Sequence, residues 1–211
     1  LNIDPSLIIS ETIGNINEML NLVGKLTDEE RVKLMIQKTE SDTNEFKQTW
    51  RLPMAELQEW QNFTEESNKI KFVVMKVISS YLNANGGELL IGYSEVSHQI
   101  EGLEGEFNYF DPGEDIKTQK DHFNTKFEHT LSSTFEDYFQ QFISPRFVIN
   151  DNKIVYFISC KKADRPCYIK GNKAKKVLGS EFYRRKGDSS DPLEGKELVE
   201  YVSNQWPNST K

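Results

Sequence analysis

The chain has 211 residues and a net charge of −7 at neutral pH, and 36% of its residues are apolar. This length fits one domain of ordinary core size with an appendage, and it is too short for two full domains. No run of about eighteen apolar residues and no signal-like segment occurs, so we expect a cytoplasmic protein that does not enter a membrane. Cys160 and Cys167 lack CxxC spacing and stand apart from the three histidines, which argues against a disulfide framework and a zinc site.

Positive charge is concentrated in the segment from Lys153 to Lys186. Eleven lysines and arginines stand there against two acids, which makes the segment +9 and the rest of the chain −16. The acidic total argues against nucleic acid as a partner, whereas a basic block within an acidic protein is typical of a polyanion-binding face. A solvated hairpin would give the same composition, so both interpretations stay open at this point.

Two helices are predicted at the N-terminus. Asp4-Pro5 provides an N-cap and a first-turn proline for a helix that ends at about Gly24. Thr27 and Glu30 form a capping box for a second helix that runs to about Ile36. We expect residues 1–37 to be a helical appendage and residues 38–206 to be the main domain. The appendage would serve as a packing element, as a dimerisation element or as the tail of a further domain.

Carboxylates and a lysine surround the first predicted strand. Glu45-Phe46-Lys47 reads as a strand, with Phe46 in the core and with Glu45 and Lys47 on the opposite face. A carboxylate beside a lysine can hold a divalent metal against a phosphate, although the tripeptide alone favours a surface salt bridge. Glu40 would join Glu45 only if a turn intervened, and residues 41–44 are of turn-forming types.

The middle of the chain alternates helices with short strands. We expect a loop with a short helix over 54–60, then a helix over 70–82 that ends at Gly86-Gly87. A hairpin of strands over 88–93 and 99–103 follows, and residues 104–121 are predicted to be a long acidic loop. Aromatic residues at helical spacing predict a helix over 123–142, which Ser144-Pro145 would stop.

The last third is predicted to be mainly antiparallel sheet. Four strand-like runs cover 146–149, 154–160, 167–170 and 181–185, and Asp191-Pro192 would cap a final helix that reaches Trp206. The order of elements predicts an α+β fold with a mixed, mainly antiparallel sheet and packed helices.

Several of these segments, taken in order, resemble the Schlafen-type AlbA-like domain over residues 38 to 190. The segments are Glu40 with Glu45-Phe46-Lys47, then 81–92, 100–103, 165–170 and 182–190. This resemblance implies nucleic-acid binding. In the Schlafen branch it implies a metal-dependent endonuclease that cleaves tRNA and rRNA through three carboxylates.

The resemblance also assigns roles to individual residues. Glu40 and Glu45 match two of the three carboxylates, and Glu95 stands where the family usually has Asp. These three side chains would hold Mg²⁺ or Mn²⁺, and Lys47 would assist the phosphate. The cations expected to follow the nucleic-acid backbone are Lys161, Lys162, Lys173, Lys175, Lys176, Arg184, Arg185 and Lys186.

Two other functions remain alternatives. A DNA- or RNA-binding regulatory module without catalysis would need the basic block but no metal, and a protein-interaction domain would need neither. ATP is not expected, because the chain lacks GxxxxGK[ST] and because Glu88, directly after Gly86-Gly87, would repel phosphate. A single copy of the domain suggests a homodimer, since family members with two copies form a basic cradle from both.

Overall fold

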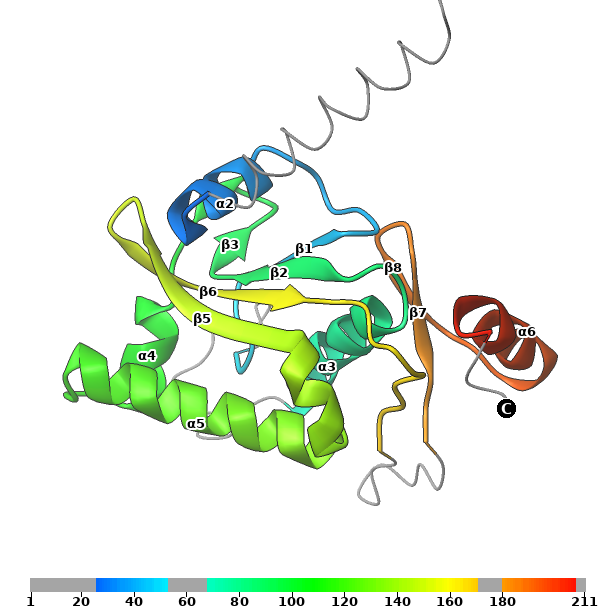
Figure 1. Ribbon diagram of the computed structural model, residues 1–211. Helices are drawn as coiled ribbons and strands as arrows, with labels where there is room; N and C mark the ends of the chain where they lie inside the picture. The colour runs from blue at the N-terminus through cyan, green and yellow to red at the C-terminus, as the bar shows by residue number, and fades with distance from the viewer. Residues whose placement is uncertain (1–25, 53–67, 171–179, 208–211) are drawn as a thin grey trace, which may run out of the picture.

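The fold is built on a mixed four-stranded sheet. The computed structural model describes residues 26–52, 68–170 and 180–207 (Figure 1). The strands are ordered β1 (Asn44–Lys47), β2 (Gly87–Ile91), β6 (Lys153–Cys160) and β5 (Ile143–Asn150). β1 pairs parallel to β2, and the other two pairs are antiparallel. The predicted α+β class and the mainly antiparallel sheet are confirmed.

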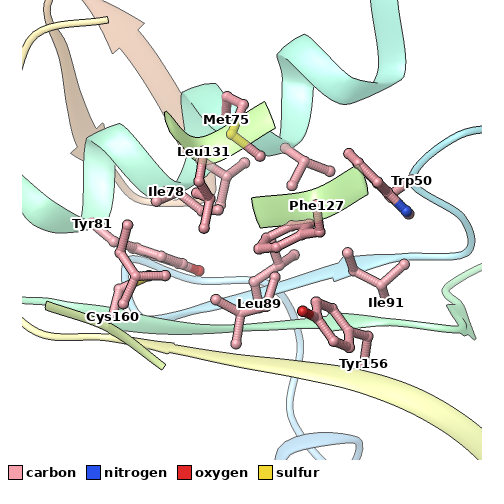
Figure 2. Packing of buried hydrophobic residues seen from close by; sticks show 14 of the residues in the cluster. Trp50, Met75, Ile78, Tyr81, Leu89, Ile91, Phe127, Leu131, Tyr156 and Cys160 are labelled. Atoms are coloured by element: carbon pink, nitrogen blue, oxygen red, sulfur yellow. The ribbon is translucent and has the colours of Figure 1, made fainter. Parts of the chain in front are cut away.

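Helices cover both faces of this sheet (Figure 1). On one face, α3 (Asn68–Leu82) and α5 (Ile116–Thr134) cover the sheet, and Figure 2 shows their side chains packed over Leu89 and Ile91 of β2. On the other face, α2 (Asp28–Met35) packs over Leu90. Side chains alternate between the two faces of a strand, so the continuous apolar run in β2 serves both layers.

α2 begins as the capping box predicts. Thr27 Oγ1 accepts the Glu30 N–H at 3.2 Å, and Glu30 Oε2 accepts the Thr27 N–H at 2.7 Å. Val32 and Met35 are buried against the sheet, so the described part of the expected appendage contributes to the core. The helix expected before Gly24 and the short helix expected over 54–60 lie outside the described residues.

A glycine makes the tight turn between α3 and β2. Gly86 has φ +81°, and its N–H donates to the Tyr81 carbonyl at 3.0 Å. A Cβ at Gly86 would lie 2.5 Å from the backbone oxygen of Cys160. The turn therefore requires glycine both for its backbone conformation and for the close approach of β6.

The predicted acidic loop over 104–121 is wrong. α4 (Glu104–Phe110) fills the first half, and the Asp115 carboxylate caps α5 by accepting the N–H groups of Lys117 and Thr118. Glu106 of α4 is buried and accepts the Arg51 Nε–H at 2.7 Å. Glu106 is thus buried because it pairs with Arg51, although composition alone predicts an acid exposed to solvent.

Element boundaries in the second half also differ from those predicted. α5 ends at Thr134, and a 3₁₀ helix, η2 (Asp137–Phe142), leads into β5, so Pro145 lies in an edge strand, where proline is tolerated. Residues 167–170 contribute one bridge, between Ile169 and Glu181. The remaining elements are β3 (Tyr93–Ser94), β4 (Gln99–Ile100), β7 (Tyr183–Lys186), β8 (Ser189–Pro192) and α6 (Gly195–Gln205).

β8 takes the place of the helix cap expected at Asp191-Pro192, and α6 begins only at Gly195. The hairpin predicted over 88–93 and 99–103 is shorter than expected. It is formed by β3 and β4 alone, because Gly92, at φ +107°, separates β3 from β2. None of the helices within the described ranges combines the length and the apolar character needed to cross a bilayer.

Substitution of Gly86 tests the turn between α3 and β2. We expect Gly86→Ala to lower the free energy of unfolding by about 3 kcal/mol, because it adds backbone strain and a clash with Cys160. Gly113→Ala is the matched control: Gly113 has φ +83° but open space at its Cβ, so the loss there should be about 1 kcal/mol. Urea unfolding measures both, and equal losses would contradict the role assigned to the close approach of β6.

Candidate functional site

A turn brings Glu40 alongside β1. Ser41 Oγ accepts the N–H groups of Thr43 and Asn44, both at 3.2 Å, and the Ser41 N–H donates to the Asn44 carbonyl at 3.0 Å. The chain therefore reverses, and Glu40 Oε1 accepts the Phe46 N–H at 3.0 Å. The predicted turn between Glu40 and Glu45 is confirmed.

Lys47 lies between the two carboxylates of this strand. Its Nζ is 3.3 Å from Glu40 Oε1, contacts Glu45 Oε1 and donates to the Phe46 carbonyl at 2.7 Å. The Lys47, Glu40 and Glu45 side chains are 24%, 20% and 6% exposed. The cluster is therefore mostly withdrawn from water, unlike a solvated surface salt bridge, and its charges interact more strongly.

Arg185 of β7 completes the cluster from the far end of the chain. Its Nη1 lies 2.7 Å from Glu45 Oε2, and its Nε and Nη2 donate to the carbonyls of Ser41 and Asn44. The guanidinium also lies over the Tyr81 ring, 5.0 Å from its centroid. The Arg185 side chain is 1% exposed. It is buried against Glu45 and the turn, whereas the expectation for a backbone-tracking cation was a solvent-facing side chain.

The alternation of side chains along a strand could have predicted that one of the two adjacent arginines of β7 is buried. Adjacent residues of a strand point to opposite faces, so Arg184 and Arg185 could not both face solvent. Asn83, at the end of α3, fixes which of them turns inward: its Nδ2 donates to the carbonyls of Tyr183 and Cys167 and so holds β7 against α3. The sequence motif included Asn83 without assigning it this positioning role.

Glu95 follows β3 and faces the same cluster. Its side chain is exposed, yet desolvation, the charge of Glu40 and a hydrogen bond with Glu40 together raise the pKa of its carboxyl. Burial alone would also raise the pKa of Glu40, but the Phe46 N–H and the Lys47 ammonium hold it below its ordinary value. The charges of Glu40, Glu45 and Glu95 therefore act on one another. The excess negative charge raises the pKa of Glu95, whereas Glu40 keeps a lowered pKa.

The donor types of this group fit a hard divalent cation. Carboxylate oxygens are the ligands that Mg²⁺ and Mn²⁺ prefer, and three acids outnumber the two cations Lys47 and Arg185. Over the described ranges, no set of three or more His, Cys, Asp or Glu side chains is already arranged to ligate a metal. The Lys47 ammonium holds the position between Glu40 and Glu45, so a cation shared by these two acids would have to displace it.

The other predicted cations are spread over several elements. Lys161 and Lys186 are exposed, and Arg184 is partly buried. Lys162 donates to Gln205 Oε1 at 2.5 Å and lies over the Trp206 ring, so it packs against the C-terminal helix. The remaining three, Lys173, Lys175 and Lys176, lie outside the described residues.

Comparison with known proteins gives a family match. The family model described as Schlafen, AlbA_2 matches residues 40–194. No curated protein sequence matches the chain. A crystal structure of the DIP2311 protein from Corynebacterium diphtheriae is similar at 16% identity and a TM-score of 0.45, over 78% of this chain and 27% of that one. The chain thus spans about a quarter of the length of that protein. The family match contains all five residues of the cluster and begins after α2.

The raised pKa of Glu95 predicts a pH-dependent effect of its removal. The folded state binds the Glu95 proton more tightly than the unfolded chain does, so the ionised carboxylate destabilises the fold above the raised pKa. Glu95→Gln should therefore be more stable than the native protein at pH 8, by about 0.5 kcal/mol or less at this exposed position, with no gain below pH 4. Thermal unfolding across this range measures it, with the exposed Glu114→Gln as control. A gain that is the same at both pH values would contradict the assignment.

Neighbouring arginines of β7 provide a second test. Arg185→Met leaves Glu45 buried with Lys47 as its only charged partner and frees the turn carbonyls of Ser41 and Asn44, so we expect a loss of about 3 kcal/mol in the free energy of unfolding. Arg184→Met alters the adjacent, partly buried side chain and should change stability by about 1 kcal/mol or less. Urea unfolding compares the two variants, and an equal loss in both would show that the Arg185–Glu45 ion pair contributes no particular stability to the fold.

Proposed function

Because the chain belongs to the Schlafen AlbA_2 family, we propose that it binds nucleic acid and that its carboxylate cluster is the centre of a metal-dependent endoribonuclease. The observation that carries the catalytic part is that the exposed Glu95 interacts electrostatically with the largely buried pair Glu40 and Glu45, so that three acids act on one another at this place. A surface that only binds a polyanion has no use for three acids, because each of them repels phosphate.

Glu40, Glu45 and Glu95 would hold the metal. A bound Mg²⁺ or Mn²⁺ would supply Lewis-acid polarisation of the scissile phosphate. Arg185 would keep Glu45 oriented, since it binds both the carboxylate and the turn carbonyls beside it. The Lys47 ammonium, once released from between the acids, would neutralise charge on the phosphate.

The proposed substrate is RNA, with tRNA or another structured RNA as the first candidate. This choice follows the Schlafen resemblance, and the exposed Lys161 and Lys186 are compatible with a phosphate backbone at the surface. We also propose that a cytoplasmic homodimer brings two copies of the domain to one substrate.

A non-catalytic DNA- or RNA-binding module is the second candidate, and one observation favours it. Both oxygens of Glu45 are already engaged, one by Lys47 and one by Arg185. If these cations stay in place, the acids act as structural anchors for the turn before β1, and the protein binds nucleic acid without cutting it.

Cleavage of total tRNA separates the two candidates. Purified protein is incubated with Mn²⁺, with Mg²⁺ or with EDTA, and the products are resolved on a denaturing gel. We expect discrete fragments that require metal, and Glu95→Gln should slow cleavage by about 100-fold or more, because it removes a ligand without destabilising the fold. Glu45→Gln should abolish cleavage, and Glu114→Gln should cleave like the native protein.

Either of two results would contradict the nuclease. Cleavage that persists in EDTA, or that is unchanged in both Glu95→Gln and Glu45→Gln, would place the activity outside this cluster. Intact tRNA in every lane, together with a gel shift that weakens steeply with salt, would establish the non-catalytic binder instead.

A further inference from the structure

A basic groove of about 450 Å³ lies beside α2, on the face of the sheet opposite α3 and α5. Arg31 of α2, Arg146 of β5 and the two lysines Lys38 and Lys161 line it. Figure 1 shows α2 and the segment that leads to β1 on this side of the sheet. Glu45 and Lys47 alternate with Phe46, which faces α2, so their side chains belong to the other face.

Two arginines form the floor of this groove. Their guanidinium groups lie over the same ring, that of Phe157, at 5.2 Å for Arg31 and 4.7 Å for Arg146. Arg31 contacts Glu88 and donates to Ser159, and Arg146 donates to both oxygens of Asp28 at 2.5 Å. The arginines are therefore fixed in place, and the two acids balance their charge.

Two lysines give the groove its excess positive charge. Lys38 and Lys161 are exposed, and within the described ranges neither forms an ion pair. The four cations exceed the neighbouring acids Glu88 and Asp28 by two charges. Fixed arginines with two free ammonium groups at the rim are the combination that recognises phosphate.

One turn joins this groove to the carboxylate cluster. Thr43 and Asn44 line the groove, while the carbonyls of Ser41 and Asn44 bind Arg185 on the cluster side. β1 is an edge strand, so only the start of one strand separates the two sites. A chain of phosphates could pass around this edge from one site to the other.

We propose that the groove binds phosphates of a nucleic-acid strand that flank the phosphate at the carboxylate cluster. This inference rests on the proposed binding of nucleic acid and adds a second contact region to it. Arg31 and Lys38 precede the residues that match the family, so the groove depends on the N-terminal segment of this chain. A free phosphorylated metabolite shares this chemistry, but the exposed lysines and the adjoining cluster favour a longer polyanion.

Paired lysine variants test the groove. The groove variant is Lys38→Ala with Lys161→Ala, and the control is Lys117→Ala with Lys126→Ala, two exposed lysines of α5 on the far side of the sheet. Both lose two charges, and unchanged thermal unfolding verifies that both fold. Binding of a labelled single-stranded RNA of about 12 nucleotides is measured by fluorescence anisotropy in EDTA across a range of salt.

We expect the groove variant to bind the RNA about tenfold more weakly and to lower the salt slope by about 1.4, the value for two lost phosphate contacts on a single strand. The control should bind like the native protein. Adenosine 5′-monophosphate should bind weakly, with a dissociation constant above about 1 mM, and equally to all three proteins.

The contrary outcomes have different meanings. If the native protein binds neither RNA nor DNA, nucleic-acid binding fails and the groove assignment fails with it. If it binds RNA but the groove variant and the control weaken binding equally, the groove alone is overturned. Tight binding of adenosine 5′-monophosphate that only the groove variant loses would overturn the strand assignment in favour of a small phosphorylated ligand.

Discussion

The buried contact between Arg185 and Glu45 is the constraint on which the site depends. One guanidinium neutralises the least exposed acid of the cluster and also binds the two carbonyls of the turn that returns Glu40 to β1. Without it, the nearly buried Glu45 would keep only the Lys47 ammonium as a charged partner, and the turn would lose its anchor. Asn83 holds β7 where Arg185 can reach, so the end of α3 supports the site although it contributes no charge to it.

The edge strand β1 organises charge on both of its sides. One face of it carries Glu45 and Lys47, on which Glu40, Glu95 and Arg185 converge, and the turn before it forms part of a basic groove on the opposite face. A polyanion approaching this edge would meet positive charge on one side and an acid-rich, partly dry cluster on the other. Under the proposed function, this arrangement would separate binding from chemistry, since the lysines would attract the strand and the carboxylates would hold the metal.

The parts of the fold that depend on neighbouring residues could be predicted from the sequence. The capping box of α2, the glycine turn after α3, the strand at β1 and the turn before it all follow from residues within a few positions of one another. Features that depend on distant partners were missed. α4 is helical although its segment reads as a polar loop, because Glu106 pairs with Arg51, and Arg185 turns inward because of the register in which β7 meets α3. Composition assigns such charges to solvent, and only the assembled fold shows where they lie.

The separation of the paired residues along the chain has a consequence for synthesis. Arg185 binds the Asn44 carbonyl across 141 residues, so the acids leave the ribosome long before their partner exists. Until β7 docks, Glu45 has only the Lys47 ammonium to balance its charge, and burying it is less favourable than in the complete fold. Arg185 can therefore join the cluster only after most of the chain has been synthesised. A chain that stops short of β7 would therefore lack the Arg185 anchor of this cluster, and any activity proposed for the cluster would require the complete fold.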